Sequence, residues 1–518
     1  MIKQLQGMPL VWVTISLSLA IFMNVLDISI ANVSIPYMAG DLGVSPNQGT
    51  WVITSFAVCQ AIFLPITGWL AMRIGEVKLF LISTLLFTIA SILCGLAFNF
   101  PMLITARALQ GMAAGPMIPL SQSILLAIYP ENKKGFATSL WVMVAVVAPV
   151  FGPILGGWIT YHYSWPWIFY INLPVGIIAL FITWFWMKGV ESKIINKPID
   201  LIGLILIIIG VGALQILLDK GNDLDWFGSS TIVMLGVVSF VSLSFLILWE
   251  LTEENPVIDL MLFKYRNFTI GVIAMSLGFL VYFGTIVVFP LWLQTQAGYT
   301  AVWAGLTIAP IGILSVILSP VVGKSIDKVD PRLIISVGFL VFALVSFWNG
   351  SFNTSVGFSE LVLPRFVQGI GVSCFFIPLI VISTAGLAPS RMASALGLAN
   401  FFRILGGSFG TSIIISMWNR REKFHHSQLV EQITSYNPIS LKEIKKLQEL
   451  GLNGLSSYSE LDAIISKQAS MLSLNDIFWL SGVIFLGLLF IVWYAKPPFI
   501  NKNTSDPDGE LTGHAIPE

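Results

Sequence analysis

An aspartate and an arginine, Asp27 and Arg107, each lie inside a long apolar stretch of this sequence. A charge at the centre of an apolar helix costs roughly 2.5–3.5 kcal/mol on insertion scales, so such residues are functional candidates. Asn24, Ala31 and Ser34 share a helix face with Asp27, which gives a small, polar stripe suited to a water-filled cavity. We therefore predict that Asp27 loads and releases protons. The alternative is an acid that only pairs with a cation to fix helix packing.

Arg107 is the natural partner of Asp27 because the two residues lie at comparable depth. The helix of Arg107 begins near Phe100, so Arg107 lies ~10 Å below that face of the membrane, and Asp27 lies ~15 Å below it. Gln110, Ala114, Met117 and Ser121 follow Arg107 on one helix face. The alternative is a structural arginine that binds backbone carbonyls.

The composition indicates a membrane protein. Of 518 residues, 56% are hydrophobic and only 10% are charged, with a mean hydropathy of +0.85, whereas about 25% of a soluble domain is charged. A chain this apolar could not cover its own surface in water. The formal net charge of zero gives no indication of nucleic acid as a partner.

The residues that bind metals or perform covalent chemistry show no matching pattern. Cys59, Cys94 and Cys374 are far apart in apolar runs, and the histidines lack metal-site spacing to an acid or cysteine. The sequence has no His/Asp or Cys/His arrangement and no phosphate-binding glycine loop. We therefore predict no enzyme, no metal and no cofactor, with the proton gradient as the energy source. If the protein were a channel, there would be no reason for an acid such as Asp27 to be present in only one half of the chain.

Apolar runs of about 20 residues predict about fourteen membrane-spanning helices. The predicted spans are 10–37, 49–70, 79–98, 101–128, 137–160, 167–187, 201–218, 230–249, 268–291, 301–323, 333–349, 361–387, 396–418 and 473–495. With both termini in the cytoplasm, the inside loops hold many Lys and Arg residues, whereas the short outside loops hold only Lys220. This is the positive-inside pattern. The basic outer loop 419–472 is long enough to be translocated despite its charge.

Two halves of the sequence repeat each other at an offset of about 255 residues, as in transporters built from two related bundles. Pro65-x-x-Gly68 matches Pro320-x-x-Gly323, and Arg107-x-x-Gln110-Gly111 matches Arg365-x-x-Gln368-Gly369. We predict an all-α integral membrane protein of two six-helix bundles plus two inserted helices. The predicted division is a first bundle at 1–190, two inserted helices at 191–266, a second bundle at 267–496 with the periplasmic loop 419–472, and a disordered cytoplasmic tail at 497–518.

The two halves differ at the position of the acid. Arg365 matches Arg107, but Tyr282 stands where an offset of about 255 residues places the counterpart of Asp27. The proton site is therefore expected in the first half alone.

The chain resembles the major facilitator superfamily, and within it the fourteen-helix drug:proton antiporters. The resemblance covers nearly the whole chain and is specific when its motifs are taken together. The residues that carry it are Leu26 to Val33, Gly68 to Lys78, Arg107 to Gly111, Gly152 to Gly157, Gln215 to Trp226 and Asn267 to Gly271.

This resemblance implies the major facilitator fold and the export of hydrophobic drugs and toxic compounds in exchange for protons. It also implies that Arg107 takes part in proton coupling. A dedicated exporter of a single metabolite, lipid or siderophore is the alternative function. The resemblance further places the protein in a bacterial inner membrane and implies a periplasmic adaptor and an outer-membrane channel, which would form a tripartite pump with it.

Glycine-rich motifs are the candidate conformational elements. A proline kinks a helix and glycines four apart allow close helix approach, so the fifth span is expected to pack on the facing half and to slide or rock. Gly68, Arg73 and Gly75 resemble the family's loop that locks the two halves, although Met72 stands where the family has aspartate. The residues of this set are Gly68, Arg73, Gly75, Gly111, Gly152, Pro153, Gly156 and Gly157.

Substrate binding is expected from aromatic and polar residues of a central cavity. The candidates are Asn24, Gln60, Gln110, Tyr282, Phe283, Phe375 and Phe402. Arg403 lies in the thirteenth span, and two positions remain open for it: the cavity, or the cytoplasmic edge, to which a long side chain can reach.

Overall fold

The structure is a computed structural model that describes residues 4–44, 46–130, 133–192, 194, 198, 200–254, 256–326, 328–388, 391–434, 436–449 and 455–499. Long helices dominate it, because a helix satisfies its backbone groups internally in an apolar solvent. The helices are α1 (Met8–Asp41), α2 (Pro46–Gly49), α3 (Trp51–Ile74), α4 (Glu76–Gly95), α5 (Phe100–Ile128), α6 (Lys134–His162), α7 (Trp167–Tyr170), α8 (Asn172–Met187), α9 (Leu201–Lys220), η2 (Trp226–Gly228), α10 (Ser230–Thr252), η3 (Leu260–Lys264), α11 (Arg266–Thr295), α12 (Ala301–Ser325), α13 (Pro331–Asn349), α14 (Phe358–Thr384), α15 (Met392–Glu431), α16 (Pro438–Glu449) and α17 (Leu455–Val492).

The number of spans agrees with the sequence prediction. Within the described residues, thirteen helical segments are long and apolar enough to cross a membrane, and α6 makes a fourteenth when its two bent parts count as one span. Polar side chains cap the start of some of these helices: Asn99 accepts a hydrogen bond from the Met102 amide at 2.9 Å, and Asp330 accepts one from the Arg332 amide at 2.9 Å. The Arg332 side chain also donates to Asp330 and lowers the pKa of that carboxyl.

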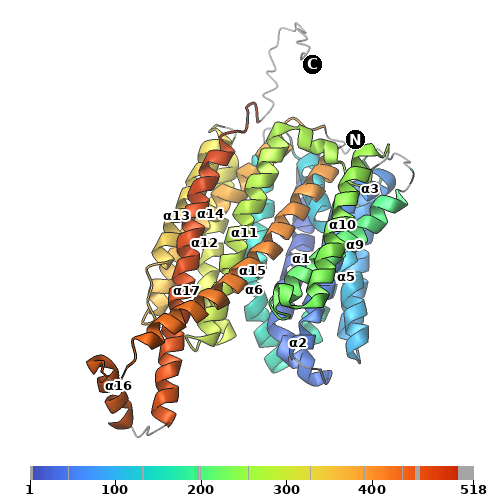
Figure 1. Cartoon of the computed structure of the whole chain (residues 1–518). Coiled ribbons are helices and arrows are strands. Elements are labelled where there is room, and N and C mark those ends of the chain that lie inside the picture. The colour runs from blue at the N-terminus through green and yellow to red at the C-terminus, as the bar shows by residue number, and fades with distance from the viewer. Residues whose placement is uncertain are drawn as a thin grey trace.

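The same helix pairs pack in the first and second halves of the chain. In the first half α1 packs on α6 and α3 on α5, and in the second half α11 packs on α15 and α12 on α14. The two halves meet along two helix pairs, α6 with α12 and α3 with α15. Figure 1 shows the two groups of helices side by side.

We call the end of the bundle where α1 begins and α17 ends the termini end, and the other the loop end (Figure 1). The two halves touch closely at the termini end. A Cβ atom added to Gly68 would lie 2.6 Å from Cα of Ser394, and one added to Gly323 would lie 2.6 Å from the carbonyl oxygen of Gly135. Only glycine fits such contacts, so the halves are closed against each other at this end.

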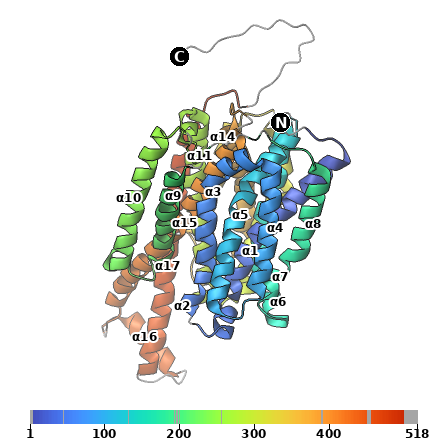
Figure 2. The same ribbon diagram turned by 90° about the vertical axis from the view of Figure 1, so that its right-hand side faces the viewer.

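The helices α9 and α10 form a pair on the side of the bundle, with α9 against α3 and α15 (Figure 2). The end of α9 is joined to both halves by hydrogen bonds. Thr54 of α3 donates to Asp219 of α9, and Gln215 of α9 donates to Ser408 of α15 at 3.0 Å. The Gln215–Trp226 segment therefore fills the space between α3 and α15.

The predicted outer loop 419–472 is mostly helical. The helix α15 continues to Glu431, α17 begins already at Leu455, and α16 lies between them at Pro438–Glu449. Ion pairs join the two long helices here, because Asp476 of α17 contacts both Arg421 and His425 of α15 at 2.7 Å. Figures 1 and 2 show α16 and the adjoining parts of α15 and α17 extending beyond the other helices. Of the predicted tail 497–518, residues 500–518 lie outside the described part of the chain.

Candidate functional site

Asp27 of α1 and Arg107 of α5 form an ion pair in the interior of the first half. Neither side chain has any exposed surface. Arg107 Nη1 donates to Oδ2 of Asp27, so the two residues that the sequence placed at comparable depth are in direct contact. The attraction within a buried charge pair offsets the cost of its burial only when further hydrogen bonds satisfy most of the remaining donors and acceptors.

Amide side chains hold the other oxygen of the carboxylate. Gln110 Nε2 donates to Asp27 Oδ1 at 3.0 Å, and Asn172 Nδ2 at the start of α8 donates to the same oxygen at 2.9 Å. Both amides also donate to the Ser91 hydroxyl of α4, at 2.7 and 3.2 Å. Gln110, predicted as a substrate residue, is therefore in contact with the Asp27 carboxylate.

Sequence reasoning missed Asn172 and Ser91. Both side chains are buried in the structure. In the sequence, the one signal for them is a polar residue within a mostly apolar stretch. Four helices, α1, α4, α5 and α8, thus supply the polar groups around the carboxylate.

Arg107 is held in place by contacts on its other side. Its Nε donates to the carbonyl oxygen of Val52 at 3.0 Å, and its guanidinium lies 4.3 Å from the ring centre of Phe56. Its Nη1 also donates to Gln110 Oε1 at 2.7 Å, whereas Nη2 has no hydrogen-bond partner. Val52, Phe56 and Gln110 thus hold the guanidinium of Arg107 in place, and the group stays charged because an arginine is not deprotonated in proteins.

Asn24 and Gln60 form a separate polar contact one turn of α1 away from Asp27. Gln60 Nε2 donates to Asn24 Oδ1 at 3.2 Å, and Asn24 donates to the carbonyl oxygen of Ala114 at 3.0 Å. Both side chains are buried. Ala31 and Ser34, the other members of the predicted stripe, are also buried in this conformation.

The aromatic candidates gather inside the second half. Tyr282 and Phe375 belong to one ring cluster, in which Tyr282 lies 5.4 Å and Phe375 5.8 Å from the ring of Phe342. Phe283 stacks on Phe279 at 5.2 Å and is partly exposed, and Phe402 lies edge-on to Phe263 near η3.

A small closed cavity lies between the two halves. Residues of α5 and α6 line it from the first half, and residues of α11, α14 and α15 line it from the second half. The lining residues are Gln122, Trp141, Met275, Phe376, Ile380, Ser383, Leu396, Ala399, Asn400 and Arg403. The structure thus places Arg403 at the cavity and not at the cytoplasmic edge, and none of the seven substrate candidates lines this cavity.

The glycines of α6 pack mainly on α1, the helix that carries Asp27. A Cβ on Gly152 would lie 2.9 Å from the carbonyl carbon of Ser29, and one on Gly156 would lie 2.9 Å from Cγ1 of Ile30. Of the motif glycines in α6, Gly157 faces the other half, 3.6 Å from Val302. The helix α6 as a whole packs on α12 of the facing half, as expected for the fifth span, while Gly152 and Gly156 hold it against α1.

The helix α6 is bent by 43° between its parts Lys134–Pro149 and Ile154–His162, where the sequence predicts a kink. The side chain of Pro153 lies outside the described residues.

The other motif glycines also make close contacts. A Cβ on Gly111 would lie 3.0 Å from the Phe56 backbone, which brings α5 close to α3. Gly75 has φ +98°, a conformation that glycine adopts without strain. Next to it the Glu191 carboxylate accepts hydrogen bonds from the amides of Val77 and Lys78 at 3.0 and 2.9 Å. Arg73 lies over the ring of Trp69 at 5.4 Å.

Metal binding finds no support in the described part of the chain, which has no group of three or more His, Cys, Asp or Glu residues that could hold an ion. The buried Asp27 network and the cavity between the halves are two candidate sites, one for a proton and one for a small molecule.

Comparisons with known proteins place this architecture in a family. The family model described as "Major Facilitator Superfamily" matches residues 17–411. The multidrug export protein EmrB of Escherichia coli K12 is 50% identical over 96% of this chain and 97% of its own. The fatty acid resistance protein FarB of Neisseria gonorrhoeae is 48% identical over 96% of this chain and 98% of its own.

A solved structure supports the same fold. The human organic anion transporter MFSD10 aligns with 93% of this chain and 100% of its own at a TM-score of 0.56, with 11% identical residues. The sequence relatives and the fold agree with the resemblance predicted from the motifs. This chain is a multi-pass membrane protein and belongs to the major facilitator superfamily, a family of transporters.

Proposed function

We propose that this protein is a proton-coupled antiporter that exports hydrophobic drugs and toxic compounds from the cytoplasm or the inner membrane. The observation that carries the proposal is the wholly buried Asp27–Arg107 pair, because Asp27 is an acid without exposed surface whose partner is a fixed cation. The relationship to multidrug export proteins over almost the whole chain supports the substrate class.

Proton binding changes the charge of the first half. With Asp27 ionised the pair is neutral, and with Asp27 protonated the half carries the uncompensated charge of Arg107 in its interior. Burial makes an unpaired charge costly, so the two protonation states favour different arrangements of the surrounding helices. A proton can bias the rocking of the halves only through such a difference between states.

The glycine contacts of α6 can transmit a change in the position of α1 to the other half of the molecule. Gly152 and Gly156 press against Ser29 and Ile30, which follow Asp27 by two and three residues. A displacement of α1 at Asp27 would therefore move α6, and α6 contacts α12 of the other half.

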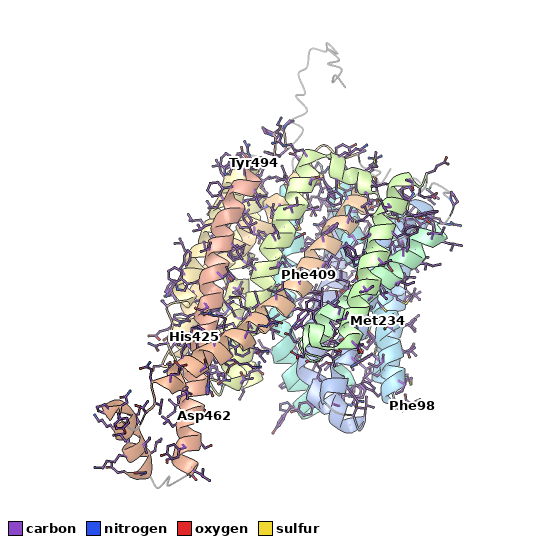
Figure 3. All side chains as sticks on the ribbon, viewed as in Figure 1. Phe98, Met234, Phe409, His425, Asp462 and Tyr494 are labelled. Atoms are coloured by element: carbon purple, nitrogen blue, oxygen red, sulfur yellow. The ribbon has the colours of Figure 1, made fainter. Side chains whose placement is uncertain are left out.

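The distribution of basic residues supports a location in a bacterial inner membrane with both termini in the cytoplasm. In this orientation the closed termini end faces the cytoplasm, and protons reach Asp27 from the loop end. The helices α15, α16 and α17 then extend into the periplasm, where Figure 3 marks His425 and Asp462 on α15 and α17.

The extended helices are the proposed contact with a periplasmic adaptor of the EmrA type, which would join the protein to an outer-membrane channel of the TolC type in a tripartite pump. Apolar side chains support this contact, because Tyr436 and Leu455 beside α16 are 93% and 89% exposed. A protein partner that covers these side chains would remove their apolar surface from water.

A dedicated exporter of a single metabolite, lipid or siderophore is the second candidate function. The relationship to a fatty acid resistance protein at 48% identity favours a lipid among these substrates.

Dye efflux from cells tests the proposal. We expect the wild type to expel a hydrophobic dye, and expect a protonophore or Asp27→Asn to stop the efflux. Efflux that survives both treatments would exclude proton antiport through Asp27, whereas failure to export any dye would favour the dedicated exporter.

A further inference from the structure

Arg403 of α15 is a cation without an acidic partner. Among the described residues no carboxylate lies within ion-pair distance of it. Its Nε and Nη2 donate to the neutral amide oxygen of Asn400 at 3.2 and 3.0 Å, and its guanidinium lies 4.9 Å from the ring centre of Phe279. A cation in an apolar interior normally pairs with an anion, and the described part of the chain supplies no such counter-charge for Arg403.

The position of Arg403 relates this missing charge to ligand binding. The side chain lines the cavity between the halves, together with Asn400 and, from the first half, Gln122. In the closed conformation the cavity has room for about one water molecule. A larger ligand is therefore admitted only when the halves separate.

The polar groups at this cavity are mainly donors. Gln122 is 2% exposed, and its Nε2 has no hydrogen-bond partner. The Gln122 oxygen already accepts from Asn400 Nδ2 at 3.2 Å, and the Asn400 oxygen is occupied by Arg403. The unpartnered amide of one half and the unpaired guanidinium of the other thus both require an acceptor.

The remaining walls of the cavity are apolar or aromatic. Trp141 and Phe376 line it from opposite halves, with Met275 and Leu396 beside them. Ligand sites of this type hold an apolar body by surface burial and orient it with a few polar groups.

From these observations we propose that Arg403 and Gln122 form an anion-binding subsite, which selects hydrophobic compounds that carry a carboxylate or a comparable anionic group. The inference rests on the proposed export function and adds the substrate class. An anion bound here is contacted from both halves, because Gln122 belongs to α5 and Arg403 to α15. A purely structural arginine would require no such ligand, and the experiment separates the two roles.

Binding to the purified full-length protein in lipid nanodiscs tests the subsite without a proton gradient. The probes are three compounds with one ring system and different charge: naphthaleneacetate, its neutral amide, and naphthylethylammonium. Equilibrium dialysis should show that the wild type binds the anion at least about tenfold more tightly than the cation, the scale of a charge-assisted hydrogen bond. Equal binding of the three probes, or no binding of the anion, would overturn the proposal.

Variants at both positions assign the effect to the named residues. Arg403→Gln should weaken binding of the anion about tenfold or more and leave the neutral amide unchanged, and Arg403→Lys should restore part of the loss. Gln122→Glu should place a counter-charge beside Arg403 and shift the preference towards the cation. Lys442→Gln on the exposed face of α16 removes a positive charge elsewhere and should change nothing.

The changes in binding affinity and in transport distinguish this inference from the proposed function. If Arg403→Gln weakens all three probes equally, or if Gln122→Glu leaves the preference unchanged, the anion subsite is excluded. If the wild type prefers the anion but does not move it along a pH gradient in proteoliposomes, the subsite stands and the proton antiport fails.

Discussion

Arg107 and Arg365 occupy matching positions in the two halves of the chain, and their surroundings are similar in three respects. Both are fully buried. Each donates to the glutamine three residues later, at 2.7 Å for Arg107 and 2.9 Å for Arg365. Each also lies over a phenylalanine ring, at 4.3 Å from Phe56 and 4.0 Å from Phe289.

The two sites differ in the acid. Arg107 contacts Asp27, whereas Tyr282 stands at the corresponding position of the second half, and both Nε and Nη2 of Arg365 have no hydrogen-bond partner. The Arg–Gln pair over an aromatic ring is thus common to both halves, whereas among the described residues the carboxylate with its amide donors is found in the first half alone. We therefore propose a packing role for the shared part and proton chemistry for the part that differs.

The largest expected effect comes from removing each arginine in turn. Arg107→Gln leaves Asp27 buried without its cation and should lower the free energy of unfolding by about 3–5 kcal/mol. Arg365→Gln removes a charge that has no counter-ion in the described structure and should cost much less. Thermal unfolding of both variants in detergent measures the difference, and equal losses would contradict the assigned roles.

Removing both charges of the pair should separate stability from function. The double variant Asp27→Asn, Arg107→Gln leaves no unpaired charge and should recover most of the stability that Arg107→Gln loses. It should not recover efflux, because no proton carrier remains. Recovery of efflux in this variant would show that the pair is only structural.

Gln110 and Gln368 occupy matching positions in the two halves, and replacing them should give a smaller difference in stability. Gln110→Leu removes hydrogen bonds to Asp27, Arg107 and Ser91 and should destabilise the protein by about 1.5–3 kcal/mol. Gln368→Leu removes a single bond from Arg365 and should cost about 1 kcal/mol. Chemical denaturation of the two variants should rank them in this order, and the reverse order would break the comparison.

Asn172→Ala should have the smallest effect, visible in the rate of efflux. The variant removes one of the two amide donors to Asp27 Oδ1 while the Arg107 contact remains, so the carboxylate is held less firmly and efflux should slow without being lost. Asn349→Ala, which removes a buried amide of α13, serves as the control. An unchanged rate in Asn172→Ala, or the same decrease in both variants, would show that Asn172 does not act on the carboxylate.

The sequence predicted the helices and the charged pair for physical reasons. Hydropathy locates a span because the bilayer accepts only apolar helices, and charges such as Asp27 and Arg107 are conspicuous there. Asn172 and Ser91 could not be assigned, because a single polar residue in a span does not reveal which helix it faces.

Two other features also depended on three-dimensional packing. The helices α15 and α17 continue past the apolar runs, where Arg421 and His425 bind Asp476 and hydropathy gives no signal. The aromatic substrate candidates pack in the second half instead of lining the cavity between the halves, because aromatic residues in a membrane protein serve the core as readily as a ligand site.

Proton movement in proteoliposomes tests the role of Asp27 most directly. An outward substrate gradient is imposed on vesicles that contain a pH-sensitive dye, with the wild type and Asp27→Asn compared. We expect the wild type to move protons against the substrate flow, and expect Asp27→Asn to exchange substrate across the membrane without proton movement. Proton movement at the wild-type rate in Asp27→Asn would contradict the account.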